Sequence, residues 1–397
     1  MPRRMRSPTV VILVDHGFVS GGQSKVAIES TLGLALAGAR PIFFCARGPV
    51  DPRLAQAGVE TTCLDQYDIL DNPSRAAAAV QGTWNAKAAA ALAELLARLP
   101  RENAIVHAHG WAKALSSSIA NPIRASKLPA VYTMHEYFLA CPNGGFYNFQ
   151  KQAVCTVKAM SAACWATNCD SRNYPFKLWR NARLAVARGA GLASCFEDFL
   201  LISDLQQALL ASYLPKGART HRVSNPIEAE ALGQKENPAS GETLFVGRLS
   251  AEKGALLFAE AARTAGVTPV FIGDGPIAPR LREQYPEARL LGWLEPAAVR
   301  AAMRAARTLV FPSLWYEGLG LTALEAKAMG TPVVVSDICA AREQIADGAE
   351  GLWFTSGDAA SLASALERVK DDALVARLSR AAYPDFTNWR GAGALTG

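Results

Sequence analysis

The sequence predicts an α/β fold of two facing doubly wound, Rossmann-like domains with a cleft between them. Apolar strands alternate with helical segments along the chain, which is the pattern of an open parallel sheet. This alternation stops at a polar stretch that begins at Asn225 and then restarts, and 397 residues exceed the roughly 150 residues of one average domain. We therefore expect one domain over 1–224, a second over 225–380, and a tail over 381–397 that packs back on the first domain through Trp389.

The first half begins with a strand, a glycine-rich loop and a helix, and then repeats this alternation. Apolar runs predict strands at 9–14, 41–45, 104–108, 130–134, 200–203 and 221–223. Apolar residues on a 3.6-residue period predict helices at 25–37, 74–99, 112–125 and 174–187. An irregular insert over 136–172 precedes the last of these helices.

The second half shows the same alternation. Its predicted strands are 243–246, 269–272, 289–291, 309–311 and 333–335. Its predicted helices are 253–265, one from 278, 296–306, and one that carries Glu325 and ends at Gly330. In such sheets ligands bind beyond the carboxyl ends of the strands, so two facing halves place their ligand in the cleft between them.

The charge of the chain is unevenly distributed. Residues 1–224 hold 24 Lys and Arg against 14 Asp and Glu, whereas residues 225–397 hold 17 against 21. A basic first half favours an anionic partner such as a membrane surface, a lipid phosphate or an acidic saccharide. We find no recognition motif and no basic stripe with interleaved aromatic residues, which argues against nucleic acid as the partner.

The composition also bears on location. No run of about 18 uninterrupted apolar residues occurs, which argues against a membrane-spanning helix. The apolar run near the start covers only Val10 to Val14 before Asp15 ends it, so we interpret it as a buried first strand rather than a signal peptide. Eight cysteines in a chain without a signal peptide then point to a reducing cytosol.

The segment 311–335, FPSLWYEGLGLTALEAKAMGTPVVV, links two strands through a loop and a helix. We expect Glu317 just before this helix and Glu325 in its early turns, both facing the cleft, where a carboxylate can accept hydrogen bonds from vicinal hydroxyls. The free N–H groups and the dipole of the helix suit an anion. The alternative is structural, because Thr322 and Glu325 have the spacing of a capping box and Glu317 is then an ordinary solvated acid.

A second segment, GRLSAEKG at 247–254, follows a strand and opens a helix. Arg248 and Lys253 therefore lie at the carboxyl end of a strand, where both can reach one anionic group. Breaking the bond between a sugar and a diphosphate develops negative charge on the diphosphate, and two cations can compensate for that charge without a metal ion. The alternative is that both are solvated surface cations.

These segments carry a resemblance to a known family. GRLSAEKG, the GDGP turn, LGWL and EGLGLTALEAKAMGTPVVVS, in this order and spacing, resemble the second half of family 4 glycosyltransferases of the GT-B fold. The pattern of Glu, seven residues, Glu is specific in this context, and the resemblance covers residues 9 to about 370. It implies a retaining hexosyltransferase that requires no metal or other cofactor and takes a UDP- or GDP-sugar as donor. The implied step is a front-face displacement in which the leaving phosphate helps to deprotonate the acceptor.

The resemblance also implies roles for single residues. Arg248 and Lys253 bind the donor diphosphate, Glu325 the nucleotide ribose, and Glu317 the hydroxyls of the transferred sugar. The expected catalytic residues are His135, Arg248, Lys253 and Glu317. The remaining residues expected in the donor site are Gly21, Gly22, Gly247, Gly273, Gly318, Leu319, Gly320 and Leu321.

The glycine-rich loop of the first half agrees with this interpretation. Gly21 and Gly22 resemble the loop of the family in which the backbone approaches phosphate or acceptor. A rival interpretation is a phosphate-binding NTPase loop that starts at Gly17. Gln23 stands where that loop needs a lysine, which argues against it.

Three histidines are candidates for the acceptor side. His135 ends the strand VYTMH and matches the cleft histidine of the family, so we expect it to contact a hydroxyl or to contribute its carbonyl dipole near the reacting sugar; a structural role is the alternative. His107 and His109 alternate along IVHAHGW, and we expect them to face opposite sides, with His109 at the acceptor site. His16 and Ser203 are weaker candidates.

The insert resembles that of a family subgroup with a cysteine-bearing loop after the histidine. It holds four cysteines separated by 13, 8 and 4 residues, namely Cys141, Cys155, Cys164 and Cys169. These spacings depart from the tight pairs of structural zinc sites, so we expect free or packed thiols and no metal. A metal or redox site is the alternative.

The predicted helix after the insert combines basic and aromatic residues. The aromatic residues are Phe176 and Trp179, and the basic ones are Lys177, Arg180, Arg183 and Arg188. This combination suggests docking at an anionic membrane, with an ordinary surface helix as the alternative.

We therefore expect a cytoplasmic glycosyltransferase, in peripheral contact with the inner face of the membrane, that acts on a saccharide or polyprenol-linked acceptor in surface polysaccharide or glycan assembly. One alternative is a GT-B sugar-nucleotide epimerase or phosphorylase. Another is a catalytically silent sugar-binding protein, which the presence of Arg248, Lys253, Glu317 and Glu325 disfavours. The sequence does not predict the base, the sugar, the acceptor or the linkage.

Overall fold

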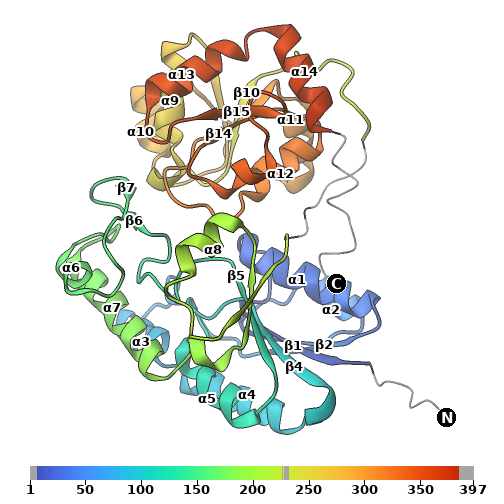
Figure 1. Cartoon of the computed structure of the whole chain (residues 1–397), viewed down its shortest axis with the longest axis vertical. Helices are drawn as coiled ribbons and strands as arrows, with labels where there is room; N and C mark the ends of the chain where they lie inside the picture. Colours follow the sequence, from blue (N-terminus) through green and yellow to red (C-terminus); the bar gives the residue numbers. More distant parts are fainter. Residues whose placement is uncertain (1–6, 226, 228–231, 384–397) are drawn as a thin grey trace.

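The computed structural model of the chain describes residues 7–225, 227 and 232–383. Two α/β domains lie one above the other along the long axis of the molecule, each around its own sheet (Figure 1). This arrangement confirms the predicted fold of two doubly wound domains. The limits at 224 and 380 stay a prediction, and Trp389 with the rest of the predicted tail beyond 383 lies outside the described residues.

The N-terminal domain contains a parallel sheet. Its strands are β1 (Thr9–His16), β2 (Arg40–Arg47), β3 (Glu60–Cys63), β4 (Ala104–Ala108), β5 (Ala130–Met134), β8 (Asp198–Leu201) and β9 (Arg219–Arg222). They follow the order β3-β2-β1-β4-β5-β8-β9. Along β1, Val11 and Leu13 pack into one core while Ile12 and Val14 pack into the other, which is why this strand is a continuous apolar run.

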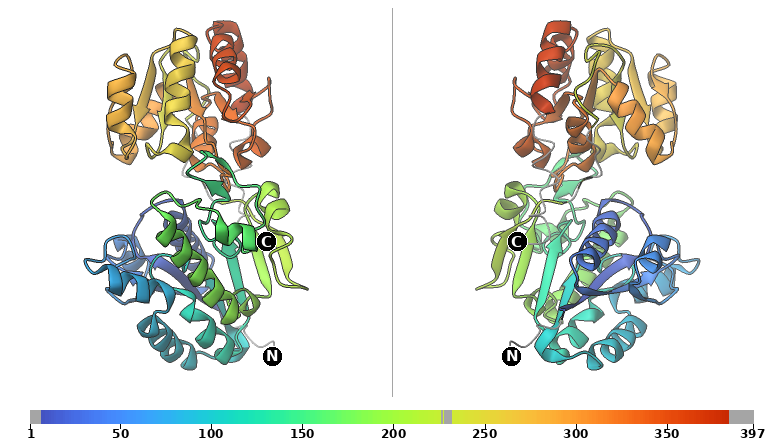
Figure 2. Two further views of the ribbon diagram at one scale, coloured as in Figure 1. Left: turned by 90° about the vertical axis from the view of Figure 1, so that its left-hand side faces the viewer. Right: turned by 90° about the vertical axis from the view of Figure 1, so that its right-hand side faces the viewer.

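Helices cover both faces of the N-terminal sheet, as the two side views show (Figure 2). They are α1 (Gly22–Leu36), α2 (Pro52–Gln56), α3 (Arg75–Thr83), α4 (Ala86–Ala97), α5 (Ala120–Ser126), α6 (Ala162–Ala166), α7 (Tyr174–Gly189), α8 (Asp204–Leu210) and the 3₁₀ helices η1 (Arg101–Asn103), η2 (Ser117–Ile119) and η3 (Ala193–Cys195). The insert also carries a short antiparallel pair, β6 (Tyr147–Asn148) and β7 (Ala153–Val154).

The C-terminal domain repeats this architecture. Its parallel strands are β10 (Thr243–Val246), β11 (Pro269–Ile272), β12 (Arg289–Leu290), β13 (Thr308–Phe311), β14 (Val333–Ser336) and β15 (Gly351–Phe354). They follow the order β12-β11-β10-β13-β14-β15. Its helices are α9 (Ala255–Thr264), α10 (Ala278–Gln284), α11 (Pro296–Ala305), α12 (Leu321–Ala328), α13 (Ala359–Arg368), α14 (Asp372–Ala382), η4 (Ala251–Lys253) and η5 (Ala340–Gln344).

Two predicted helices of the first half are wrong in extent. The alanine-rich stretch 74–99 forms two helices, α3 and α4, because the side chain of Asn85 accepts a hydrogen bond from Ala88 N and starts a new helix there. The stretch 112–125 is helical only from η2 onward. Before it, the backbone N–H groups of residues 113–115 donate to the buried carboxylate of Asp15, so they are not available to a helix.

Candidate active site

The loops that follow β10 and β13 lie side by side because these two strands are neighbours in the sheet. Leu314 N donates a hydrogen bond of 2.8 Å to Glu252 O, which ties the two loops together. Gly254 makes this approach possible, since a Cβ at that position, with φ of 72°, would lie 1.9 Å from Pro312 O. The predicted donor segments 247–254 and 311–320 therefore meet at one edge of the C-terminal sheet.

Glu317 is a largely shielded carboxylate of this edge, with its side chain 13% exposed. Its Oε1 accepts hydrogen bonds from Trp315 Nε1 at 2.7 Å and from Ser313 Oγ at 3.1 Å, and it forms an ion pair with Lys253. Burial raises the pKa of the Glu317 carboxyl, but the charge of Lys253 and these hydrogen bonds outweigh burial and lower it below its ordinary value. The site therefore holds a preoriented, ionised carboxylate.

Two cations lie on the loop after β10. Lys253 Nζ pairs with Glu317 and also lies 5.3 Å from the centre of the Trp315 ring. Arg248 is exposed, and among the described residues it makes no ion pair or hydrogen bond with another side chain. The predicted pair of cations is thus divided: Lys253 is engaged with the carboxylate, whereas Arg248 faces solvent.

The loop that holds Glu317 reaches the N-terminal domain. A Cβ on Gly318 would lie 3.4 Å from His135 O and 3.3 Å from Ile202 Cδ1. A Cβ on Gly22, in the glycine-rich loop of the other domain, would lie 3.3 Å from Leu321 Cδ1 at the start of α12. The structure therefore brings together the predicted site residues of both halves.

Glu325 lies within α12, as expected, and its carboxylate faces the other domain. Its Oε1 lies 3.0 Å from Nζ of Lys25 in α1. The capping box considered above is wrong: Gly320, with φ of 81°, precedes α12, and Thr322 is already inside the helix. Lys25 was not predicted from the sequence, because it is 300 positions away from its partner and belongs to no recognised motif.

A second carboxylate joins the domains nearby. Glu343, in η5 of the C-terminal domain, accepts hydrogen bonds from Asp204 N and Leu205 N in the first turn of α8, at 2.9 and 2.7 Å. The side chain of Ser203 caps the same helix by accepting from Gln206 N. Ser203, a weak site candidate, thus has a structural role.

The three histidines form a row, and the expectation that His107 and His109 face opposite sides is wrong. Residues two apart share a face of a strand, and their ring centres lie 4.1 Å apart. His109 Nδ1 lies within hydrogen-bond distance, 3.0 Å, of His135 Nε2. Burial lowers the pKa of His107 to about 4 and of His135 to about 3, and it also lowers the pKa of His109. These side chains are neutral at neutral pH.

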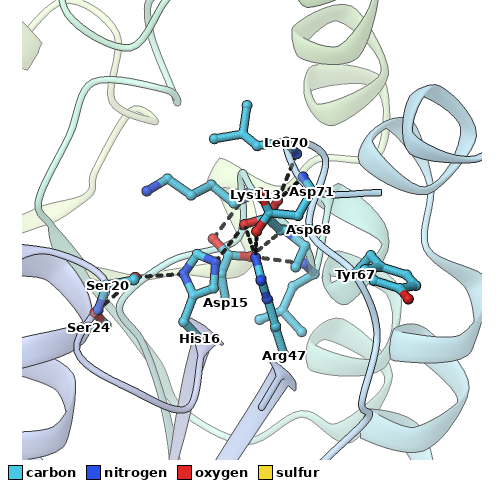
Figure 3. A network of polar contacts seen from close by, with 12 residues as sticks. Asp15, His16, Ser20, Ser24, Arg47, Tyr67, Asp68, Leu70, Asp71 and Lys113 are labelled. Carbon is cyan, nitrogen blue, oxygen red and sulfur yellow. Dashed lines mark hydrogen bonds and ion pairs between the residues drawn. The ribbon is translucent and has the colours of Figure 1, made fainter. Parts of the chain in front are cut away.

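A polar network occupies the carboxyl ends of β1 and β2 (Figure 3). His16 Nε2 lies 3.0 Å from Asp68 Oδ2, and Ser20 Oγ lies 2.9 Å from His16 Nδ1. Arg47 forms ion pairs with Asp68 and Asp71. Burial raises the pKa of the Asp68 carboxyl, but hydrogen bonds from His16 and backbone N–H groups together with Arg47 lower it overall. Of this network, sequence reasoning found only His16.

Glu136 was also missed, although it directly follows His135. Burial raises the pKa of its carboxyl to about 7, against the lowering effect of Lys113 and Arg183, while Asp15 adds to the rise. Its Oε1 is buried without a hydrogen-bond partner among the described residues. The sequence did offer one indication of Glu136, because an acidic residue directly follows the predicted strand VYTMH.

Gln23 and the insert both make contacts that hold parts of the site in place. The Gln23 side chain donates to His109 O, which holds the start of α1 against the end of β4. In the insert, a Cβ on Gly145 would lie 2.5 Å from Trp315 Cε3, so the turn of the insert packs directly on the ring whose N–H group holds Glu317.

A buried lysine lies beside a cysteine of the insert. Lys177 Nζ lies 3.3 Å from Cys164 Sγ, and all eight cysteines of the chain are free. Over the part of the chain that the structure describes, no group of three or more His, Cys, Asp or Glu side chains is arranged to hold a metal ion.

The prediction that the helix after the insert docks at a membrane is partly wrong, because Lys177 and Arg183 point into the protein rather than toward a membrane. No helix within the described ranges is long and apolar enough to cross a membrane.

The chain is similar in sequence to known glycosyltransferases. Residues 241–372 match the family model described as "Glycosyl transferases group 1". The chain is 29% identical over 300 residues to the glycogen synthase of Mycobacterium tuberculosis, covering 72% of this chain and 64% of that protein. It is 31% identical over 188 residues to the Escherichia coli UDP-Gal:alpha-D-GlcNAc-diphosphoundecaprenol alpha-1,3-galactosyltransferase, covering 43% of this chain and 47% of that protein.

A solved structure has the same fold over nearly the whole chain. Anabaena Alr3699/HepE in complex with UDP and glucose superposes with a TM-score of 0.68 at 16% identity, covering 98% of this chain and 97% of that one. The chain therefore has the GT-B fold, and its residues 241–372 are similar to the group 1 glycosyltransferases. The chain spans less than two thirds of the length of the glycogen synthase that it matches.

Proposed function

We propose that the protein is a retaining glycosyltransferase that moves a sugar from a nucleotide-diphosphate-sugar to a saccharide or lipid-linked saccharide acceptor. One observation carries this proposal: Glu317, ionised and paired with Lys253, precedes Gly318, where a Cβ would lie 3.4 Å from His135 O of the opposite domain. A sugar bound between the two domains can thus contact Glu317, Lys253 and the N-terminal domain near His135 at the same time.

The donor diphosphate is bound by Arg248 and Lys253, with the N-terminus of α12 adding partial positive charge. Arg248 is exposed and makes no competing ion pair among the described residues. Lys253 is shared between Glu317 and the diphosphate. The cations compensate for the charge that develops on the leaving group, so this proposal requires no metal cofactor.

The transferred sugar is held through its hydroxyls by Glu317, whose fixed orientation comes from Trp315 and Ser313. The bond between the anomeric carbon and the phosphate oxygen breaks, and its electron pair goes to the diphosphate. The acceptor oxygen forms the new bond on the same face of the sugar, and its proton passes to the leaving phosphate oxygen. The carbonyl of His135 stabilises the positive charge on the sugar, and no protein nucleophile takes part.

The nucleotide ribose is bound by Glu325, which exchanges its ion pair with Lys25 for hydrogen bonds from the ribose hydroxyls. Gly247 and Gly273 allow close packing beneath this part of the site, because a Cβ on Gly273 would lie 2.0 Å from Gly247 O. The UDP in the Anabaena structure of the same fold favours UDP as the nucleotide, with GDP as the alternative.

The acceptor lies on the N-terminal domain, near His109, His135 and the network of Figure 3. The name of the E. coli relative states a sugar linked to diphosphoundecaprenol, which supports a lipid-linked acceptor and a role in surface polysaccharide or glycan assembly. The eight free cysteines support a cytoplasmic location. Peripheral contact at the inner face of the membrane is proposed because a lipid-linked acceptor would be held there.

A donor panel tests this proposal. We expect one of UDP-glucose, UDP-galactose, GDP-mannose and ADP-glucose to raise the melting temperature, because a ligand at 100 times its Kd adds about 2.7 kcal/mol to the free energy of unfolding. The selected donor should release its nucleoside diphosphate only with an acceptor present, with the anomeric configuration retained by NMR. Isomerisation or phosphorolysis of the donor without a saccharide acceptor would indicate the epimerase or phosphorylase instead, and binding without turnover would indicate a silent sugar-binding protein.

A further inference from the structure

A pocket of about 270 Å³ lies between α3 and α7, which run side by side on one flank of the N-terminal domain (Figure 1). Apolar side chains and three arginines line it, and its lining contains no carboxylate. Small-molecule sites usually occupy about 300–1,000 Å³, so this pocket suits one end of a ligand rather than a whole one. None of the roles assigned above uses it.

The pocket is held open by a well-packed wall. Gly82 lets the two helices approach, since a Cβ there would lie 2.7 Å from Ile69 Cγ2 and 3.1 Å from Trp179 Cζ2. Trp179 Nε1 donates to Ala79 O at 3.3 Å, and the guanidinium of Arg183 lies 4.7 Å from the centre of the Trp179 ring. The indole that forms one side of the pocket is therefore fixed from both sides.

The rim of the pocket is cationic. Arg172 is exposed, and its guanidinium lies 4.7 Å from the centre of the Phe176 ring. Arg75 donates to two backbone carbonyls of the loop before α3, and Arg180 pairs with the buried Asp170 at 2.6 Å. Three guanidinium groups face one balancing carboxylate, so the rim keeps a net positive charge beside apolar walls.

The pocket adjoins the acceptor side of the site through the segment 67–72. Asp68 and Asp71 of this segment bind Arg47 in the network of Figure 3, whereas its neighbour Leu70 lines the pocket. Leu70 is 46% exposed, so its apolar side chain is accessible to a ligand in the pocket. One short segment thus connects the polar acceptor region with an apolar, positively charged pocket.

We propose that this pocket binds the phosphate-bearing lipid portion of a lipid-linked acceptor, with the apolar chain along Trp179 and Phe176 and the phosphate on the arginines. The charge of the rim supports this occupant, because guanidinium groups bind phosphate through paired hydrogen bonds. The apolar side chains of the walls can pack against the apolar chain of the lipid. The proposal rests on the proposed function, since it names the acceptor class for that reaction.

Calorimetric titration with farnesyl phosphate, below its aggregation concentration, tests the pocket. We expect saturable binding to the wild type and at least tenfold weaker binding to Ala79→Leu, which fills the pocket, and to Arg172→Glu, which reverses charge at an exposed position. Arg188→Glu changes an exposed arginine of α7 that does not line the pocket, and this variant should bind within twofold of the wild type. Farnesol and inorganic phosphate should each bind at least tenfold more weakly than farnesyl phosphate.

Binding that Ala79→Leu leaves unchanged would overturn the proposal, as would equal losses in Arg172→Glu and Arg188→Glu, which indicate a general charge effect. Inorganic phosphate that binds as tightly as farnesyl phosphate would leave only an anion site and overturn the lipid assignment. Lys253→Ala should keep farnesyl phosphate binding, which excludes the donor site as its location. If no sugar nucleotide binds but farnesyl phosphate binding is still lost in Ala79→Leu, the proposed function fails while the pocket stands.

Discussion

Lys25 of the N-terminal domain and Glu325 of the C-terminal domain form an ion pair of 3.0 Å across the two halves of the molecule. Both side chains are mostly shielded, at 23% and 15% exposure. Glu325 is the carboxylate proposed to bind the ribose of the donor, so the pair and the nucleotide compete for one group. Donor binding is then coupled to the contact between the domains.

The first prediction follows from this competition. Lys25→Ala should strengthen binding of the nucleoside diphosphate by up to about fivefold, because it removes a competing ion pair, and ion pairs that solvent still reaches are typically worth about 0.2–1 kcal/mol. Glu325→Ala should weaken the same binding. Calorimetric titration of both variants measures the two effects, and equal weakening in both would show that Lys25 binds the donor rather than competing with it.

The second prediction concerns Glu136, whose carboxyl has a pKa raised by burial to about 7. In the unfolded chain a glutamate titrates near 4.3, so between these values the folded state holds the extra proton and stability falls as pH rises. Glu136→Gln removes this dependence. The variant should match the wild type near pH 4.5 and should gain on the order of 1 to 3 kcal/mol over it at pH 8.

Urea unfolding of wild type and Glu136→Gln from pH 4.5 to pH 8 checks this sign. The difference between the two proteins is the relevant quantity, because other groups titrate in the same range. A difference that stays constant with pH would show that the Glu136 carboxyl has an ordinary pKa in the folded state.

The third prediction concerns the contact between the insert and the donor loop. Gly145→Ala places a Cβ 2.5 Å from the Trp315 ring, which must shift and weaken its hydrogen bond to Glu317. We expect kcat to fall about tenfold or more with little change in melting temperature, since losing one such donor typically costs about 10² to 10³ in rate when it is complete. Gly189→Ala is the control, because a Cβ there meets nothing within 4 Å. Unchanged turnover in Gly145→Ala would show that the packing of the insert on Trp315 does not affect catalysis.

The sequence was sufficient where local patterns decide the structure. β1 and β13 are buried on both faces, so they are continuous apolar runs, and Glu317 and Lys253 belong to segments with recognisable order and spacing. The helix expected over 112–125 failed because Asp15, almost a hundred positions earlier, takes the backbone N–H groups that a helix needs.

Contacts between residues distant in sequence also limit how much of the site the sequence can predict. The pairing of Lys25 with Glu325 and the packing of Gly145 on Trp315 join segments far apart in sequence, so no local pattern predicts them. The error at His107 and His109 is different, because the period of a strand predicts that they share one face, as they do.

The most direct test of the central claim is the steady-state turnover of Lys253→Ala, measured with the donor selected by the panel. Lys253 is the cation that joins Glu317 to the proposed diphosphate position, and Lys370→Ala is a matched control from an exposed ion pair with Glu367 in the same domain. We predict that kcat/KM falls by about 10² to 10³ in Lys253→Ala and stays within twofold of wild type in Lys370→Ala, with both proteins folded. Near-normal turnover in Lys253→Ala would contradict the proposed active site.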